Sequence, residues 1–174
     1  MNFLDNLWQG SGGRWYGGTS KWAKFANASM LASFTVTFQG TSIAFVGSSP
    51  DVSPPYLVSI DGSEDTTSDY PELAVDSQWY TSEMLEDTLH SVQVSNLNGT
   101  DVDFAVVTIG ENTPLEEQTI IVDDNSSEII WNGQWQERTD YRYPTGITDA
   151  RPFQDGAHIS TDVGDTMAFQ FAGE

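Results

Sequence analysis

The sequence predicts an all-β protein built as an antiparallel β-sandwich, and three observations lead to this class. Aromatic residues make up 12% of the 174-residue chain, and Thr, Ser, Val and Ile crowd into short runs, a composition that suits pleated strands. Several of these runs alternate apolar and polar residues, which is the period of a half-buried strand. Asp-Gly and Asn-Gly pairs stand between runs and favour tight turns. A chain of this length supports one principal core.

The first two thirds of the chain contain the clearest strands. Residues 33–38 alternate strictly, so that Phe34 and the other large apolar side chains share one face. Further strands are expected at 41–47, 56–60, 78–84, 89–97 and 102–109. The pair Asp61-Gly62 predicts a turn after 56–60, and Asn98-Gly99 predicts that the last two of these strands form a hairpin.

The C-terminal segment repeats part of the opening pattern. IWNGQW (130–135) resembles LWQGSGGRW (7–15), and DTMAFQFAG (165–173) resembles ASFTVTFQG (32–40). This alignment pairs Trp8 with Trp131, Trp15 with Trp135, Phe34 with Met167, Phe38 with Phe171 and Gly40 with Gly173. The matches occur in the same order, which indicates a partial second copy of the unit.

We therefore expect a principal β-sandwich unit at 1–118 and a partial repeat, the first half of a second unit, at 119–174. The repeat would begin with a strand at 119–124 and would lack the closing strands of the first copy. Half a sandwich does not bury its apolar face by itself. The repeat is thus expected to pack either on the first unit or on a neighbouring chain, and the sequence leaves both arrangements open.

The formal net charge of −20 is unevenly distributed. Residues 1–40 carry a net charge of +2, 41–118 carry −15 with no Lys or Arg, and 119–174 carry −7. Such a surface repels nucleic acid and anionic membranes, and no apolar stretch is long enough to span a bilayer. The chain has no cysteine, which excludes disulfides and thiolate metal sites. The acidic surface is interpreted as a solvated one, with calcium binding as the alternative.

Three segments carry a resemblance to a known family: VDDNSSEIIWNGQW (122–135), GAHISTDVGDTMAFQFAG (156–173) and FTVTFQGTSIAFVG (34–47). Together they resemble the jelly-roll, galactose-binding-like modules of surface and extracellular proteins of mushroom-forming fungi (basidiomycetes), which often occur in tandem. The first copy departs from the family because FLDN (3–6) stands where a Val-Asp-Asp strand is usual. The resemblance implies a jelly roll and a non-catalytic, glycan-related module.

The same resemblance implies an extracellular or cell-surface location in a fungus. Members of the family usually carry a secretion signal or a membrane helix. The opening MNFLDNLWQG has neither a charged n-region nor an apolar h-region, so no signal peptide is expected in the chain as given.

Aromatic side chains are the first candidates for ligand contact, because an exposed ring stacks on the apolar face of a sugar. Tyr16 and Trp22 lie on the glycine-rich stretch GGRWYGGTSKW, where large rings have little strand to pack into. Trp79 and Tyr80 are neighbours on one strand. Since adjacent residues of a strand point to opposite faces, one ring of this pair is expected to leave the core.

A long loop at 140–153 supplies the second group of candidates. It has no counterpart of equal length in the first copy, and loops on a rigid scaffold often carry recognition residues. The ligand-binding candidates on it are Tyr141, Arg142, Tyr143 and Arg151. A plain connecting loop is the alternative interpretation.

Carboxylates and histidines are weaker signals. Asp123 and Asp124 could hold a structural calcium ion with loop carbonyls, although no carboxylate group in the chain has EF-hand spacing. His90 is in phase with the valines of its strand, so it is expected to point inward and to bond a neighbour. His158 has no second histidine nearby in the sequence, which gives little support to a transition metal. No nucleotide-binding or nucleophile motif is present, and no other cofactor is indicated.

The sequence therefore favours a carbohydrate-binding, lectin-like protein without catalysis, with glycans or polysaccharide as partners. One alternative is a self-assembling structural protein, a homo-oligomer completed by strand exchange through residues 119–174. A second alternative is a hydrolase or lyase that acts on polysaccharide, which would need two carboxylates at a defined separation in a cleft.

Overall fold

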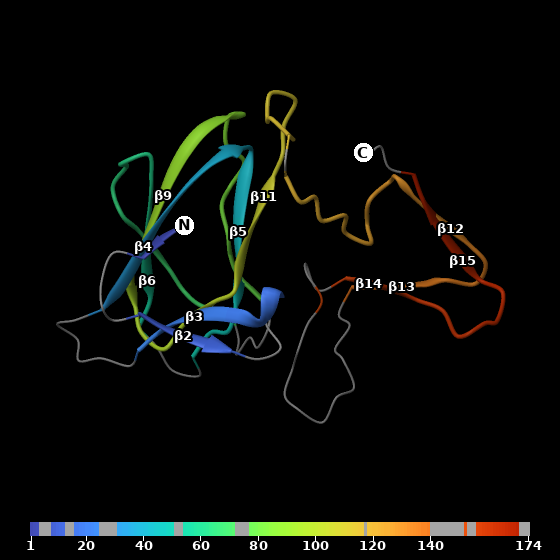
Figure 1. Ribbon diagram of the computed structural model, residues 1–174, viewed down its shortest axis with the longest axis horizontal. Helices are drawn as coiled ribbons and strands as arrows, with labels where there is room; N and C mark the ends of the chain where they lie inside the picture. Colours follow the sequence, from blue (N-terminus) through green and yellow to red (C-terminus); the bar gives the residue numbers. More distant parts are fainter. Residues whose placement is uncertain are drawn as a thin grey trace. The chain divides into compact units, whose positions relative to one another are not determined.

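Strands make up most of the computed structural model, which describes residues 1–3, 8–12, 16–24, 31–50, 54–71, 77–116, 118–139, 152 and 156–170 (Figure 1). The strands are β1 (Asn2–Phe3), β2 (Trp8–Gly12), β3 (Thr19–Ala23), β4 (Ala32–Gly40), β5 (Ser42–Gly47), β6 (Tyr56–Ile60), β7 (Thr66–Ser68), β8 (Ser77–Thr81), β9 (Thr88–Leu97), β10 (Asp101–Val102), β11 (Phe104–Thr108), β12 (Ile129–Asn132), β13 (Gln136–Arg138), β14 (Ala157–Ile159) and β15 (Thr166–Phe169). The described ranges include a single 3-10 turn, η1 (Tyr16–Gly18), and none of their helices is long and apolar enough to cross a membrane.

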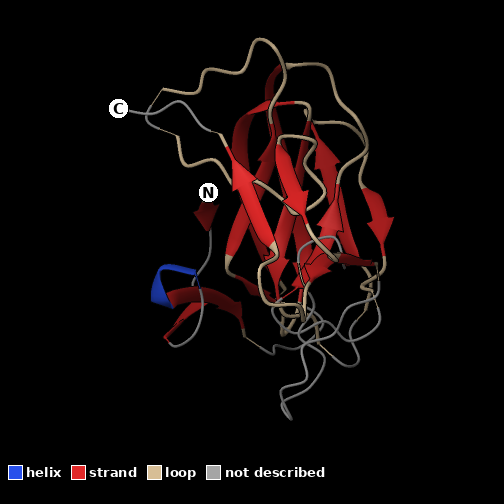
Figure 2. Ribbon diagram, turned by 90° about the vertical axis from the view of Figure 1, so that its right-hand side faces the viewer, coloured by secondary structure: helices blue, strands red, loops and turns tan. Residues whose placement is uncertain are grey.

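The chain divides into two compact units, Met1–Glu117 and Gln118–Glu174, which are called unit 1 and unit 2 below. All strand pairing is antiparallel, and every pair joins two strands of the same unit. The all-β class predicted from the sequence is confirmed (Figure 2). The jelly-roll connection and the partial second copy stay predictions.

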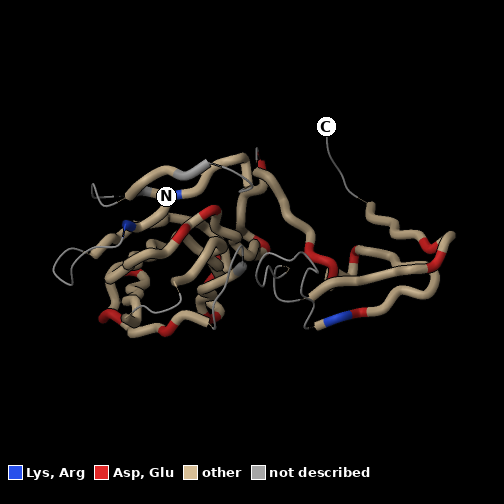
Figure 3. Tube along the Cα trace, turned by 90° about the horizontal axis from the view of Figure 1, so that it is seen from below, with Lys and Arg blue, Asp and Glu red and all other residues tan. Residues whose placement is uncertain are grey.

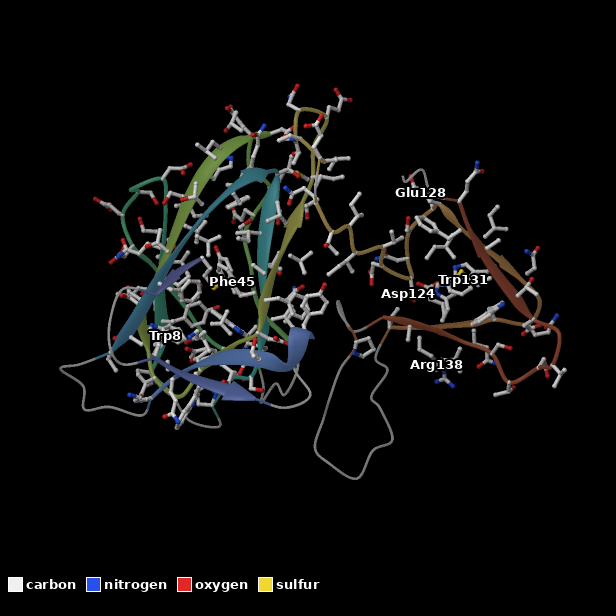
Figure 4. All side chains as sticks on the ribbon, in the orientation of Figure 1. Trp8, Phe45, Asp124, Glu128, Trp131 and Arg138 are labelled. Carbon is white, nitrogen blue, oxygen red and sulfur yellow. The ribbon has the colours of Figure 1, made fainter. Side chains whose placement is uncertain are left out.

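Unit 1 is a sandwich of two main sheets. A five-stranded sheet in the order β1-β4-β9-β6-β7 faces a three-stranded sheet in the order β11-β5-β8. The core lies where the two meet, because the Phe34 ring of β4 packs edge-on against the Phe45 ring of β5 at a centroid distance of 5.0 Å. Both rings are fully buried, and Figure 4 labels Phe45 in the interior of unit 1.

The central pair of the larger sheet confirms the alternation read from the sequence. In β4 the apolar residues predicted to share a face are buried, and the residues between them are half-buried or exposed. Val36 lies opposite Val92 of β9, and Phe38 lies opposite His90. Each inward side chain thus meets an inward side chain of the neighbouring strand, which is the pairing that stabilises a sheet.

The predicted Asn98-Gly99 hairpin is wrong. β9 belongs to the five-stranded sheet, whereas β11 pairs with β5 in the other sheet. Only Gly99 of the pair has a positive φ, at 73°, and a type I′ turn needs a positive φ at both central residues. The amide of Gly99 donates instead to the carbonyl of Ala23 at 2.9 Å, so this segment carries the chain from one sheet to the other.

Between β9 and β11 the chain forms a short strand, β10, that belongs to a third sheet in the order β10-β3-β2. Trp22 at the centre of this sheet lies opposite Asp101 on one side and opposite Gln9 on the other. The sheet adds Ala23 and Val102 to the core of unit 1.

Unit 2 contains two strand pairs, β12 with β15 and β13 with β14. The strand predicted at 119–124 is not formed: residues 119–121 are exposed and 122–124 are half-buried. TIIVDD alternates poorly, and no described strand of unit 2 pairs with its aliphatic run. Among the described residues of unit 2 none is fully buried.

Candidate functional site

Tyr16 is the most accessible of the described aromatic candidates. Its side chain is 60% exposed, and its ring lies 5.4 Å from the Phe104 ring on one side. The backbone amide of Tyr16 donates to Asp103 Oδ2 at 2.9 Å, which fixes the start of η1. Gly17 and Gly18 follow with φ values of 64° and 78°, a left-handed backbone that glycine adopts without strain. The ring therefore projects from an anchored turn.

Open surface borders this turn. A Cβ atom built on Gly10, Gly17 or Gly18 would meet no other atom within 4 Å. The backbone that follows Tyr16 is therefore not covered by other described residues at these glycines.

Trp22 lies on the adjoining strand and is half-buried. Directly opposed residues share one face of a sheet, so Trp22 and Asp101 lie on the same face. Ser20 is two residues earlier on that face, and its hydroxyl donates to Asp101 Oδ1 at 3.3 Å. We call the group of Tyr16, Trp22, Asp101 and Asp103 the Tyr16 surface; it combines two aromatic rings with two carboxylates.

Charge distinguishes this region from the rest of unit 1. Figure 3 shows acidic residues at many places along the chain and few basic ones. Lys21 and Lys24 are the basic residues of unit 1 that the structure describes, and both belong to β3 or its end. Basic side chains (Lys21 and Lys24) and acidic ones (Asp101 and Asp103) thus belong to the same part of unit 1. This mixture suits a neutral polyhydroxyl ligand better than a strongly charged one.

Trp79 corrects the expectation that one ring of the Trp79-Tyr80 pair leaves the core. Trp79 is only 3% exposed, and Tyr80 packs partly against the same core. The register of β8 on β5 explains this, because Phe45 lies opposite Tyr80 and Val46 lies opposite Gln78. Trp79 is the extra residue of a β-bulge, which breaks the alternation of faces.

Both rings consequently stack on the Phe45 ring, Trp79 at 5.4 Å and Tyr80 at 5.6 Å. Burial raises the pKa of the Tyr80 hydroxyl. Trp79 is a core residue and is not available to a ligand.

The loop candidates Tyr141, Arg142, Tyr143 and Arg151 lie outside the described residues. Their role in ligand binding stays a prediction.

Unit 2 brings together an aromatic and acidic group that the sequence treated as separate residues. His158 Nδ1 lies 2.7 Å from Asp124 Oδ2. The His158 ring stacks on Trp131 at 4.4 Å with an interplanar angle of 5°, and Trp135 lies 4.6 Å from Trp131. Figure 4 labels Trp131 and Asp124 in unit 2. Because Trp131 is on β12 and His158 is on β14, this stack joins the two strand pairs of unit 2.

The calcium prediction at Asp123 and Asp124 gains no third ligand. In the described parts of the chain no three His, Asp or Glu side chains gather as a metal site would require. One oxygen of Asp124 is occupied by His158. Burial, and next the charge of Asp124, raise the pKa of Asp123. Asp124 is thus engaged by His158, Asp123 is half-buried beside it, and calcium binding stays a prediction.

His90 confirms its expected role as an inward histidine that bonds neighbours. It is 8% exposed, its Nδ1 lies 2.7 Å from Asp61 Oδ2, and its Nε2 donates to the carbonyl of Glu86 at 2.7 Å. The sequence missed both histidine–aspartate pairs, since 29 and 34 residues separate their members. The only sequence signal for these pairs was an aspartate in or beside a turn, Asp61 in unit 1 and Asp124 in unit 2.

Comparisons with known proteins did not identify a relative of this chain. No family model matches the chain, and neither a curated protein nor a solved structure matches it.

Proposed function

We propose that this chain is a carbohydrate-binding, lectin-like protein that binds a neutral glycan at the Tyr16 surface. The observation that carries the proposal is the exposed Tyr16 ring, held by Asp103 beside open surface. A ring that is anchored through its backbone loses little conformational freedom when a ligand stacks on it. The Asp101 carboxylate, opposite Trp22, would accept from sugar hydroxyls. Asp103 instead holds the turn, because its Oδ2 accepts from the Tyr16 amide and its Oδ1 is buried.

The experiment is a glycan array, followed by titration of the best glycan into the full chain. Tyr16→Ala and Trp22→Ala are expected to weaken binding by about tenfold or more, which corresponds to ~1.4 kcal/mol. Met84→Ala is the matched control, because it also removes an exposed side chain from unit 1 but is not part of the Tyr16 surface.

Two results would overturn the proposal. One is the failure of every soluble and insoluble glycan to bind the wild-type chain. The other is binding that both substitutions leave unchanged, which would place the glycan site elsewhere, with the loop at 140–153 as the next candidate.

A second candidate function is self-assembly through unit 2. The observation that favours it is the exposure of large apolar side chains in a unit whose described residues include no buried one. The exposed residues are Ile120, Ile121, Ile130, Val163 and Met167. If these side chains form one contiguous patch, that patch would mark an interaction surface. Sedimentation velocity of the full chain over a range of concentrations tests self-assembly. A chain that stays monomeric at every concentration would contradict it.

A further inference from the structure

Unit 2 pairs its strands in the same way as the first four strands of unit 1. β1 pairs with β4 and β2 pairs with β3, while β12 pairs with β15 and β13 pairs with β14. In both units the outer strands of the four pair with one another, and so do the inner strands.

A matched hydrogen bond sets the correspondence between residues. The indole N–H of Trp8 donates to the carbonyl of Ser33 at 2.9 Å, one residue before Phe34 in β4. The indole N–H of Trp135 is shared between the carbonyl of Thr166, one residue before Met167 in β15, and the carbonyl of Asn132, each at 3.2 Å. Met167 thus takes the place of Phe34, as the sequence alignment predicts. Trp8 corresponds to Trp135 rather than to Trp131.

The two equivalent strands differ at one edge. Phe34 lies between Phe3 of β1 and Val94 of β9, so β4 is an inner strand, and Phe34 is 0% exposed. Met167 has Trp131 of β12 on one side, and β15 is an edge strand in the described structure. Met167 is 54% exposed. Among the described residues of unit 2, no strand pairs with β15 on the side that β9 occupies in unit 1.

The edge of β15 also lacks the features that protect exposed edges. Natural edge strands carry charged residues, proline or a bulge, or they are very short. β15 reads Thr-Met-Ala-Phe, pairs with β12 without a register shift and has neither charge nor proline. By contrast β1, the edge strand that corresponds to β12, is only two residues long. The pattern is that of an inner strand.

We propose that β15 pairs through this edge with β15 of a second copy of the same chain, antiparallel and about a two-fold axis. The inference rests on the second proposed function and names its partner and contact. Identical strands are always self-complementary in this arrangement, and the result is a four-stranded sheet in the order β12-β15-β15-β12 across two copies. In this arrangement β15 has a strand on both sides, as β4 does in unit 1.

The neutral strands at this edge allow contact with a second copy, and salt dependence distinguishes that copy from a basic partner. β12 and β15 contain no charged residue, so the contact itself brings neutral surfaces together. The remainder of each copy is strongly acidic, with a net charge of −20 on the whole chain. Two copies therefore repel at long range, and salt that screens this repulsion strengthens the dimer, whereas salt would weaken binding to a basic partner.

The first experiment is sedimentation velocity of the full chain at ionic strengths of about 0.01 M and about 1 M, where the Debye length falls from about 30 Å to about 3 Å. A dimer whose dissociation constant decreases with salt is expected. Ala168→Asp places like charges in the shared sheet and is expected to raise the dissociation constant about tenfold or more. Val163→Asp is the matched control, because it adds the same charge to a fully exposed turn of unit 2.

The second experiment uses the absence of natural cysteine. Each residue of β15 is replaced by cysteine and oxidised one at a time (Thr166→Cys, Met167→Cys, Ala168→Cys and Phe169→Cys), with Val163→Cys as control. At the two-fold axis, the Cα atoms of one residue in the two copies lie within the ~4.4–6.8 Å that a disulfide allows. For a residue two positions from the axis, the Cα atoms of the two copies lie ~13 Å apart. Rapid crosslinking at one β15 position and little at the others is expected. This result stands even where Ala168→Asp fails to fold.

The outcomes separate the two levels of the proposal. A chain that remains monomeric at every concentration and salt overturns self-assembly and β15 pairing together. A dimer that Ala168→Asp and Val163→Asp weaken equally, or that crosslinks no β15 cysteine, keeps self-assembly and overturns the β15 contact. A dimer that becomes weaker as salt is added would show that attraction between charged groups holds it together, and this overturns pairing through the neutral edge of β15.

Discussion

His90 Nδ1 lies 2.7 Å from Asp61 Oδ2, and this contact joins the middle of the large sheet to a turn. His90 is on β9 and Asp61 follows β6, its neighbour in the sheet. Since the other ring nitrogen donates to the Glu86 carbonyl, both nitrogens carry protons in this arrangement. The Glu86 carbonyl and the Asp61 carboxylate raise the pKa of His90, and the His90 and Ser91 hydrogen bonds lower the pKa of Asp61.

The first prediction is a pH dependence of stability that belongs to this pair. The raised pKa of His90 gives stability that is fully present below the unfolded pKa of ~6.5 and is lost as pH rises through the folded pKa. The lowered pKa of Asp61 gives stability that is present above the unfolded pKa of ~3.9 and is lost as pH falls through the folded pKa. Chemical denaturation is measured at a pH between ~3.9 and ~6.5 and again at pH ~8. The free energy of unfolding is expected to be lower at pH ~8.

His90→Gln is the control for that measurement. It removes the titrating group but keeps a side chain that can hydrogen-bond. The variant is expected to be less stable and to lose this part of the alkaline decline. An identical decline in wild type and variant would assign the effect to other groups.

The second prediction concerns the ring cluster of unit 1. Phe45 is fully buried and contacts Phe34, Trp79 and Tyr80. Phe45→Ala removes these ring contacts and leaves a cavity, so it is expected to lower the free energy of unfolding by about 3–5 kcal/mol. Leu89→Ala, which truncates a 68% exposed side chain on β9, is expected to change it by less than about 0.5 kcal/mol. Equal costs would contradict the placement of the core.

The third prediction tests the junction of β5 with β10. A Cβ atom on Gly47 would lie 2.1 Å from the backbone oxygen of Asp101, and backbone atoms yield less readily than side chains. Gly47→Ala is expected to cost about 1–3 kcal/mol or more as an overpacked contact. Gly10→Ala adds the same methyl group where nothing lies within 4 Å, and thermal denaturation of this variant should match wild type.

The fourth prediction compares the two indole hydrogen bonds. Trp8→Phe removes the donor to Ser33, and Trp135→Phe removes the donor to Thr166. A net loss of about 1 kcal/mol is expected for each in urea denaturation followed by far-UV circular dichroism. A cost at Trp8 with none at Trp135 would argue against the correspondence of the two residues.

Local patterns in the sequence predicted most of the strands of unit 1. The alternation in 33–38 identifies β4 because a half-buried strand imposes that period on its side chains, and His90 was placed inward by the same argument. Which strands would pair was not predictable in this way. β4 pairs with β9, about fifty residues later, and the choice depends on packing across the whole sheet.

The wrong predictions share a physical cause. The Asn98-Gly99 pair has the composition of a tight hairpin, but hydrogen bonds of this segment to Ala23 hold it in a sheet-to-sheet crossing. Trp79 would leave the core under strict alternation, and a bulge beside Val46 returns it. In each case a contact from a distant strand overrides the local preference. The Asp103 support of Tyr16 is equally distant in sequence, which is why the candidate surface was found only by its aromatic residues.

The uneven charge of the chain determines how the two units can be separated by proteolysis. Between Lys24 and Arg138 there is no Lys or Arg, so trypsin leaves one fragment, 25–138, that runs across the boundary after Glu117. A glutamate-specific protease has Glu111, Glu116 and Glu117 at that boundary. Cleavage there would release the two units as distinct products, which mass spectrometry can tell apart and whose folding can then be followed one at a time.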